Sequence, residues 1–187
     1  MTATPTRRRL LALGLRHGAG LSAVAALPAL ALPARAAPAR ARGLEMRHLH
    51  TREHIDIVYA RDGSYLPEAL RSLDRFLRDH YSGAVGRIDP RLHDLMHALR
   101  QTLGTDRPFD IVSGYRAPAT NAHLKATRGG GVATRSLHMD GRAIDLRIPG
   151  VPLADLRDAA LALKAGGVGY YPRDGFVHVD TGRVRRW

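Results

Sequence analysis

The sequence lacks cysteine entirely and is poor in lysine, glutamate and tryptophan, with two, three and one of these among its 187 residues. The absence of cysteine excludes disulfide bonds, thiolate metal sites and a cysteine nucleophile. The net charge of +12 therefore comes almost wholly from scattered arginines. Because there is no lysine-rich tail and no basic stretch interleaved with aromatic residues, we expect no nucleic-acid partner. An anionic polymer such as a cell wall would suit the charge equally well.

A long apolar run is also missing, and the first 36 residues come nearest to one. Arg7, Arg8 and Arg9 precede an alanine- and leucine-rich stretch that reaches about Leu32, followed by small residues at 34–36. Charged, glycine and proline residues interrupt this stretch, so it falls short of the ~20 apolar residues of a membrane span. A basic start, an apolar middle and a small-residue end are typical of an export signal, and the arginine pair resembles a twin-arginine (Tat) signal. An uncleaved anchor is the alternative.

Cleavage after residue 36 would remove five arginines and no acid, which lowers the net charge to +7. We then expect a short linker over 37–43 and a single domain over 44–187, a normal size for one hydrophobic core. The expected location is the periplasm, with no stable membrane insertion after cleavage. We expect a monomer.

The hydrophobic pattern of residues 44–187 predicts both strands and helices. Predicted strands cover a hairpin in 44–65, then 109–113, 143–148, and a second hairpin in 168–180. Predicted helices begin at Pro67, Pro90 and Pro152, with a short one at 121–126. Two strand segments and two helices, followed by a strand, a loop, another strand, a helix and a hairpin, predict an α+β domain with a mostly antiparallel sheet flanked by helices.

The stretch from Ser136 to Asp145 carries the strongest chemical signal. His138 and Asp145 stand seven residues apart with Gly141 between them, and His178 follows 33 residues after Asp145. Two imidazoles and one carboxylate are a complete ligand set for a catalytic zinc that keeps its fourth position for water. The alternative is that either histidine is an ordinary hydrogen-bonded residue.

Two further features are candidates of lower specificity. His93 and His97 have the four-residue spacing of a zinc-binding helix pair, but the H-E-x-x-H form is absent and we expect them on the flank of the helix. The glycine-rich segment 127–134 lacks a phosphate-loop signature and leads directly to His138. We expect this segment to form a rim of the site.

Three motifs together resemble the M15 zinc peptidases. These motifs are Ser136-x-His138-x-x-Gly141-x-Ala143-x-Asp145, the preceding Ser113-Gly-Tyr-Arg116, and Val177-His178-Val179-Asp180. The M15 family includes D-Ala-D-Ala carboxypeptidases, dipeptidases and peptidoglycan endopeptidases, and shares a zinc fold with the hedgehog signalling domain. The ending Gly-Arg-Val-Arg-Arg-Trp is similar to the murein endopeptidase K branch. The resemblance covers about residues 44–187.

The resemblance implies a hedgehog/DD-peptidase-like zinc fold and a role for each matching residue. His138, Asp145 and His178 would hold one Zn²⁺ per chain, and Arg116 would bind the scissile carbonyl or its oxyanion. Ser136 would support the ligand loop. The implied activity is hydrolysis of peptide cross-links in bacterial peptidoglycan, with the peptide stems as partner. A D,D- or L,D-carboxypeptidase and a non-catalytic wall-binding module are the alternatives.

The chain departs from the M15 pattern at the general base. Many relatives carry a glutamate three residues before the last histidine ligand, or a histidine two before it, where this chain has Gly175 and Phe176. Asp180 is the expected substitute because alternation on a strand places it on the same face as His178. The offset of two residues could instead make Asp180 a carboxylate that orients His178. Asp174, on the preceding turn, is then the second candidate for the base.

Overall fold

The computed structural model of the protein describes residues 41–127 and 131–187. The predicted export signal therefore lies outside the described residues. The first strand begins three residues before the predicted domain start at 44. In chain order the elements are β1 (Ala41–His48), β2 (His54–Arg61), β3 (Ser64–Tyr65), α1 (Pro67–Phe76), α2 (Pro90–Leu103), β4 (Phe109–Ser113), α3 (Pro118–Thr127), β5 (Ala143–Arg147), α4 (Leu153–Leu163), β6 (Gly167–Tyr171), β7 (Phe176–Asp180) and β8 (Arg185–Arg186).

One eight-stranded sheet organises the domain, in the order β3-β2-β1-β4-β5-β7-β6-β8. Neighbouring strands are antiparallel except for two parallel pairs, β1 with β4 and β6 with β8. The predicted α+β class with a mostly antiparallel sheet is thereby confirmed. Among the described residues, no helix has the length and apolar character needed to cross a membrane.

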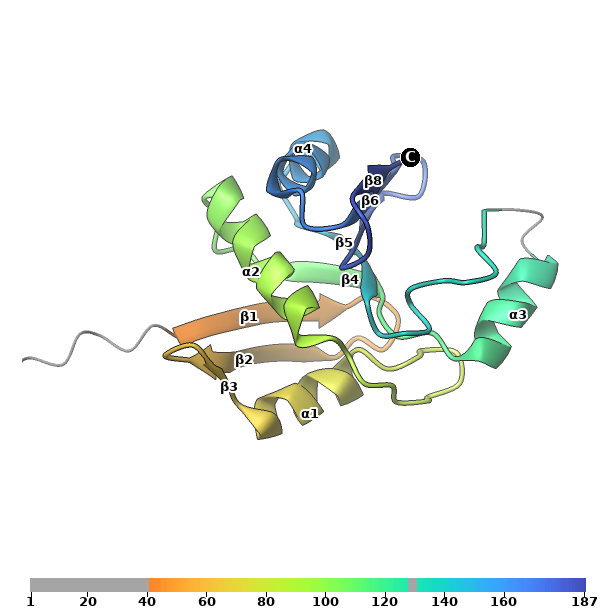
Figure 1. The fold of residues 1–187 in the computed structure, drawn as a ribbon, viewed down its shortest axis with the longest axis horizontal. Coiled ribbons are helices and arrows are strands. Elements are labelled where there is room, and N and C mark those ends of the chain that lie inside the picture. Colours follow the sequence, from red (N-terminus) through yellow and green to blue (C-terminus); the bar gives the residue numbers. More distant parts are fainter. Residues whose placement is uncertain (1–40, 128–130) are drawn as a thin grey trace, which may run out of the picture. The chain divides into compact units, whose positions relative to one another are not determined.

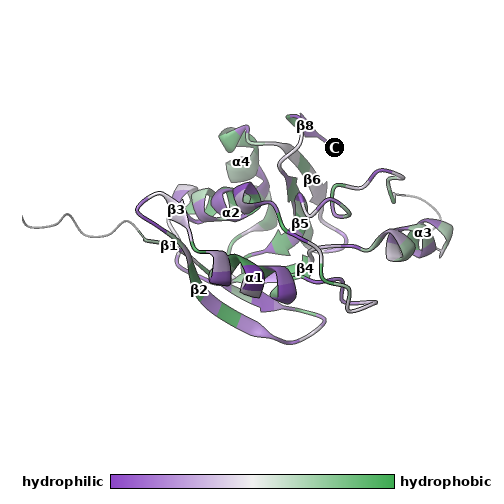
Figure 2. Cartoon of the chain, turned by 60° about the horizontal axis from the view of Figure 1, so that its bottom comes forward, coloured by the Kyte–Doolittle hydropathy of each residue, from purple (hydrophilic) through white to green (hydrophobic). Residues whose placement is uncertain are grey.

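Helices α1, α2 and α4 cover one face of this sheet and build the hydrophobic core with it. The core includes Leu73 of α1, Leu99 of α2, Leu156 of α4, Leu146 of β5 and Val179 of β7. Figure 2 shows hydrophobic and hydrophilic residues alternating along β2 and around α1, as expected for elements with one buried side. Helix α3 stands apart from the other three (Figure 1). Because strand side chains alternate between faces, the neighbours of the core residues on β5 and β7 point away from these helices.

Helix α2 begins and ends where its sequence predicts. The Asp89 side chain accepts a hydrogen bond from the backbone N–H of Arg91 at 3.0 Å, and Pro90 occupies the first turn. Gly104 ends the helix in the left-handed conformation, with φ 59°. The helix is therefore defined at both ends by local chemistry.

The same helix buries a histidine, contrary to the expectation that His93 lies on its flank. The His93 side chain is fully buried beside the Tyr59 ring, whereas His97 is only half-buried. Neither ring nitrogen of His93 has a hydrogen-bond partner within the described part of the chain. Burial lowers the pKa of His93 to about 4. His93 is thus a core residue, and among the described residues it belongs to no group of potential metal ligands.

The buried imidazole should make the fold sensitive to acid. The unfolded chain takes up a proton near pH 6.5, but folded His93 does so only near pH 4, so the free energy of unfolding falls as pH drops between these values. We expect His93→Leu to be more stable than wild type by about 2 kcal/mol at pH 5, and by less at pH 7. Urea denaturation at both pH values measures this, with His97→Leu as the matched control. An unchanged pH dependence in His93→Leu would contradict the assignment.

Candidate metal centre

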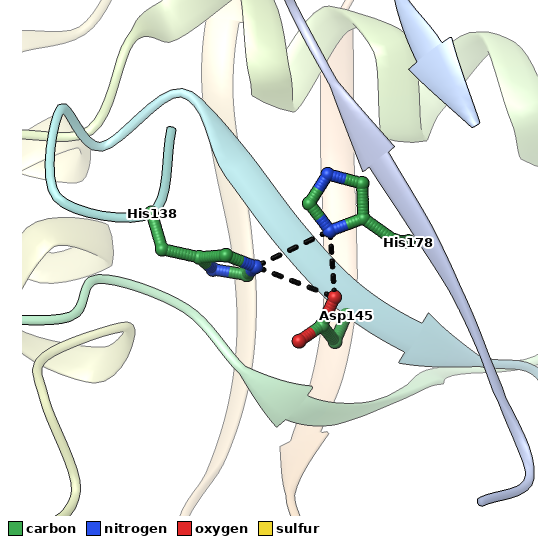
Figure 3. A group of neighbouring side chains, drawn as sticks. All are labelled: His138, Asp145 and His178. Atoms are coloured by element: carbon green, nitrogen blue, oxygen red, sulfur yellow. Dashed lines mark hydrogen bonds and ion pairs between the residues drawn. The ribbon is translucent and has the colours of Figure 1, made fainter. Parts of the chain in front are cut away.

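His138, Asp145 and His178 converge in the folded chain, as the sequence predicts (Figure 3). Nδ1 of His178 lies 2.8 Å from Oδ1 of Asp145. Nε2 of His138 lies 3.3 Å from that oxygen and 3.3 Å from Nδ1 of His178. All three side chains are buried. Three potential ligand atoms therefore surround one point.

Strand pairing places two of these residues side by side. Asp145 on β5 is directly opposite His178 on β7 in the antiparallel ladder. Both residues alternate with core side chains, so they project from the sheet face that α1, α2 and α4 leave free. The centre is consequently built on the rigid middle of the sheet.

His138 reaches this point from the loop that precedes β5. The loop turns at Gly141, which has φ +63° and lies so close to the backbone that a Cβ atom there would stand 2.0 Å from the carbonyl oxygen of Arg87. A side chain at position 141 would therefore meet both strain and a steric clash. Glycine is required at this turn to deliver His138.

In each histidine, the ring nitrogen that faces away from Asp145 makes a hydrogen bond, and this bond determines which nitrogen carries the ring hydrogen. Nδ1 of His138 lies 2.7 Å from the carbonyl oxygen of Gly114, which can only accept, so Nδ1 carries the hydrogen and Nε2 keeps a free lone pair. Nε2 of His178 lies 3.2 Å from Oδ2 of Asp180, which leaves the lone pair on Nδ1. Both lone pairs point toward Asp145, the orientation that metal ligands need.

The carboxylate of Asp145 is held in its charged form. Burial alone would raise its pKa, but in the metal-free protein the charge and hydrogen bonds of His138 and His178 outweigh burial and hold the pKa of Asp145 well below its usual range; a bound ion would take the place of those protons. A charged carboxylate and two imidazoles are donors that zinc accepts. Two bonds of about 2.0–2.1 Å meeting at a tetrahedral angle place their donor atoms about 3.3 Å apart. The observed spacings of 2.8–3.3 Å fit such an ion.

Arg116 also lies at this centre, on the loop after β4. Its backbone N–H donates to the carbonyl oxygen of His138 at 3.1 Å. Its guanidinium stands 3.9 Å from Oδ2 of Asp145 and 3.5 Å from Oδ1 of Asn121. These contacts are long, so the guanidinium keeps donors for another group in the cavity. The structure thus brings together all four residues of the predicted ligand and arginine set.

Asp180 occupies a different environment from that expected of a base. Its carboxylate is fully buried and accepts hydrogen bonds from the backbone of Gly167 and Gly182 at 2.9 and 2.8 Å, and from Arg185 at 2.7 Å. A carboxylate committed to these partners and to His178 has little capacity to take a proton from water. The geometry favours the alternative that Asp180 orients His178, whereas Asp174 is exposed.

An open cavity of about 780 Å³ lies over the centre. Its wall includes the three ligand residues, Arg116, Asp174 and residues 131–133 of the predicted rim, while 128–130 lie outside the described residues. The cavity also has an aromatic side made by Tyr171, Phe176 and Trp187, which sequence analysis missed. The sequence carried one sign of it, because Tyr171 and Phe176 flank the turn that leads to His178.

A two-histidine, one-carboxylate centre in an open cavity is typical of zinc-dependent hydrolases. A family model described as "Peptidoglycan L,D-endopeptidase MepK" matches residues 36–187, and the chain belongs to this family. The Peptidoglycan L,D-endopeptidase MepK of Escherichia coli K12 is 45% identical over 181 residues, 97% of this chain and 96% of that protein. The Probable peptidoglycan L,D-endopeptidase MepK of Haemophilus influenzae is 38% identical over 145 residues, 77% of each. No solved structure shows a significant match to the chain.

Proposed function

We propose that this chain is a zinc-dependent endopeptidase that hydrolyses L,D peptide cross-links of bacterial peptidoglycan, on a hedgehog/DD-peptidase-like zinc fold. The observation that carries the proposal is the convergence of His138, Asp145 and His178 in an open cavity. The names of relatives with 45% and 38% identity supply the substrate class. A centre with charged and oriented ligands gives no support to the alternative of a non-catalytic wall-binding module.

The three ligand atoms for one Zn²⁺ per chain would be Nε2 of His138, Oδ1 of Asp145 and Nδ1 of His178. A bound zinc ion would polarise the scissile carbonyl and lower the pKa of a water molecule to about 7. Gly114 and Asp180 hold the two imidazoles in the tautomers that this binding requires. The protein contributes ligand orientation before the substrate arrives.

Arg116 is placed to stabilise the negative charge that develops on the carbonyl oxygen during attack. Its guanidinium is largely shielded from solvent, with 15% of its side chain exposed, and it faces the cavity beside Asp145. A fixed positive charge in such a site contributes more than it would in water, because little solvent screens it. The hydrogen bond from the backbone N–H of Arg116 to the carbonyl oxygen of His138 keeps the guanidinium beside the proposed ligands.

Asp174 is the candidate proton acceptor. Besides Asp145 it is the acidic residue that lines the cavity in the described part of the chain, and it is exposed on the turn between β6 and β7. An accessible carboxylate can exchange protons with both water and a leaving amine. Asp180 has neither exposure nor free oxygens for this task.

Two matched variants separate the roles of the two carboxylates. We expect Asp174→Asn to lower kcat by about a hundredfold and to keep its zinc, because only proton transfer is lost. We expect Asp180→Asn to weaken zinc affinity by about ten- to a hundredfold, because His178 loses the charged partner that orients it. Zinc titration and steady-state kinetics on both proteins measure these effects. Wild-type turnover by Asp174→Asn would show that the base lies elsewhere.

The experiment that tests the activity is digestion of defined cross-linked muropeptide dimers by purified protein. Mass spectrometry of the products should show cleavage of the L,D cross-link and its loss when a chelator is added. Release of only a terminal D-residue would replace the proposal by the carboxypeptidase alternative. Binding to sacculi without any product would support the wall-binding alternative.

We also propose that the chain acts as a monomer in the periplasm after export by the twin-arginine pathway. The basic, apolar and small-residue order of residues 1–36 supports the export route. A peptidoglycan substrate is accessible in that compartment. Fractionation of cells that carry the double variant Arg8→Lys, Arg9→Lys tests the route, and undiminished export of this variant would exclude it.

A further inference from the structure

The indole of Trp187 lies beside His178, in the space that a side chain at Gly169 would fill. Gly169 on β6 is directly opposite His178 on β7, so a side chain there would be its cross-strand neighbour. A Cβ atom at position 169 would lie 2.7 Å from Cε2 of Trp187, which shows that the indole fills this space. The indole and imidazole centroids are 5.2 Å apart, with the rings tilted by 52°. Trp187 thus borders the metal centre.

Several contacts fix the indole in this position. The backbone N–H of Trp187 donates to the carbonyl oxygen of Val168 at 3.2 Å, and the N–H of Tyr170 donates to the carbonyl oxygen of Trp187 at 3.1 Å. The indole Nε1–H donates to the hydroxyl oxygen of Tyr171 at 2.6 Å. The guanidinium of Arg185 lies 4.8 Å from the indole ring. The ring is therefore held as part of the sheet edge.

Despite these contacts, the ring remains open to the cavity. Trp187 is 51% exposed, and it lines the cavity together with Tyr171. Because the indole has a single polar hydrogen and donates it to Tyr171, the exposed part of the ring itself is carbon surface. Such a surface attracts aliphatic groups and peptide carbons.

We propose that Trp187 and Tyr171 form an aromatic subsite that binds the aliphatic part of the peptide stem beside the scissile bond. This inference rests on the proposed function and names the part of the substrate that the wall contacts. The position of the ring decides between the two chemical parts of peptidoglycan. The indole centroid is 5.2 Å from the ring centroid of His178, a proposed zinc ligand, so a group bound on the indole lies next to the bond that is cut. The sugar chain is separated from that bond by the peptide stem.

The chain contains one tryptophan, so its fluorescence reports on this subsite directly. Zinc-loaded protein is titrated with a monomeric tetrapeptide stem, which has no cross-link, and separately with a peptide-free chitin oligomer. A saturable change in tryptophan emission is expected with the peptide and none with the sugar. A response to the sugar alone, or to neither, would overturn the proposal.

Kinetics with three variants tests the same subsite by an independent readout. For Trp187→Ala we expect KM for the muropeptide dimer to rise about tenfold with kcat and zinc content close to wild type, because substrate contact is lost. Gly169→Ala should behave similarly, since its methyl group displaces the indole without removing it. Trp187→Phe, which retains an aromatic ring, should fall between these and wild type.

The outcomes separate this inference from the proposed function. A lower kcat or a loss of zinc at unchanged KM would mean that Trp187 only supports His178, and the subsite would be rejected. A wild-type protein that cleaves no cross-link would instead overturn the proposed function. The fluorescence titration would still decide whether the aromatic wall binds a stem peptide.

Discussion

Substitution of His138 by alanine is expected to lower kcat/KM for muropeptide dimers by on the order of a thousandfold or more. The variant would lose one of the three proposed ligand atoms, and Asp145 and His178 alone would hold zinc weakly. Zinc content and kcat/KM should fall together. Atomic absorption on the dialysed protein and product analysis by mass spectrometry measure the two quantities.

His123→Ala is the matched control for this variant. His123 is exposed on α3 and does not line the cavity, so we expect wild-type zinc content and activity. Removal of metal from the wild-type protein by a chelator should reproduce the His138→Ala defect, and added zinc should reverse it. Cleavage at the wild-type rate by a metal-free His138→Ala protein would show that the metal assignment is wrong.

The second large effect is expected at Arg116. Replacement by alanine should lower kcat by about 10²–10³-fold with little change in zinc content, because the loss falls on the charge that develops during attack. Arg116→Lys keeps a positive charge but presents a compact ammonium group in place of a planar guanidinium, so we expect it to recover only part of the rate.

Arg71→Ala is a charge-matched control for both Arg116 variants. Arg71 is exposed on α1, which covers the opposite face of the sheet, and it pairs with Glu68. We expect this variant to keep the wild-type kcat. A loss of zinc from Arg116→Ala that accounts for its lower rate would contradict a direct role in charge stabilisation.

Sequence reasoning succeeded where local chemistry decides the outcome. The caps at Asp89 and Gly104 define α2, and alternation along β5 and β7 places Asp145 and His178 on one face. The glycine at 141 follows from the turn that joins His138 to β5. The helix caps and the glycine turn depend on residues that are neighbours in the chain. Strand alternation gives the face of Asp145 and of His178 separately, and the pairing of β5 with β7 across α4 and β6 then sets them side by side.

Features that depend on distant pairing could not be predicted. The parallel pairing of β1 with β4 and of β6 with β8 joins segments whose match is not encoded in a turn. Trp187 reaches His178 only through the second of these pairs. Burial of His93 and the commitment of Asp180 to Arg185 likewise depend on which elements pack together.

The distribution of the ligands along the chain has a thermodynamic consequence. His138 and His178 are 40 residues apart, and the N–H of Asp89, which caps α2, donates to the carbonyl oxygen of Gly141 in the ligand loop. An unfolded chain cannot hold the three donors together, so a metal that binds them favours the folded state by mass action. Folding and metal uptake then become linked equilibria. The fraction of folded protein would rise and fall with the free zinc available where the chain acts.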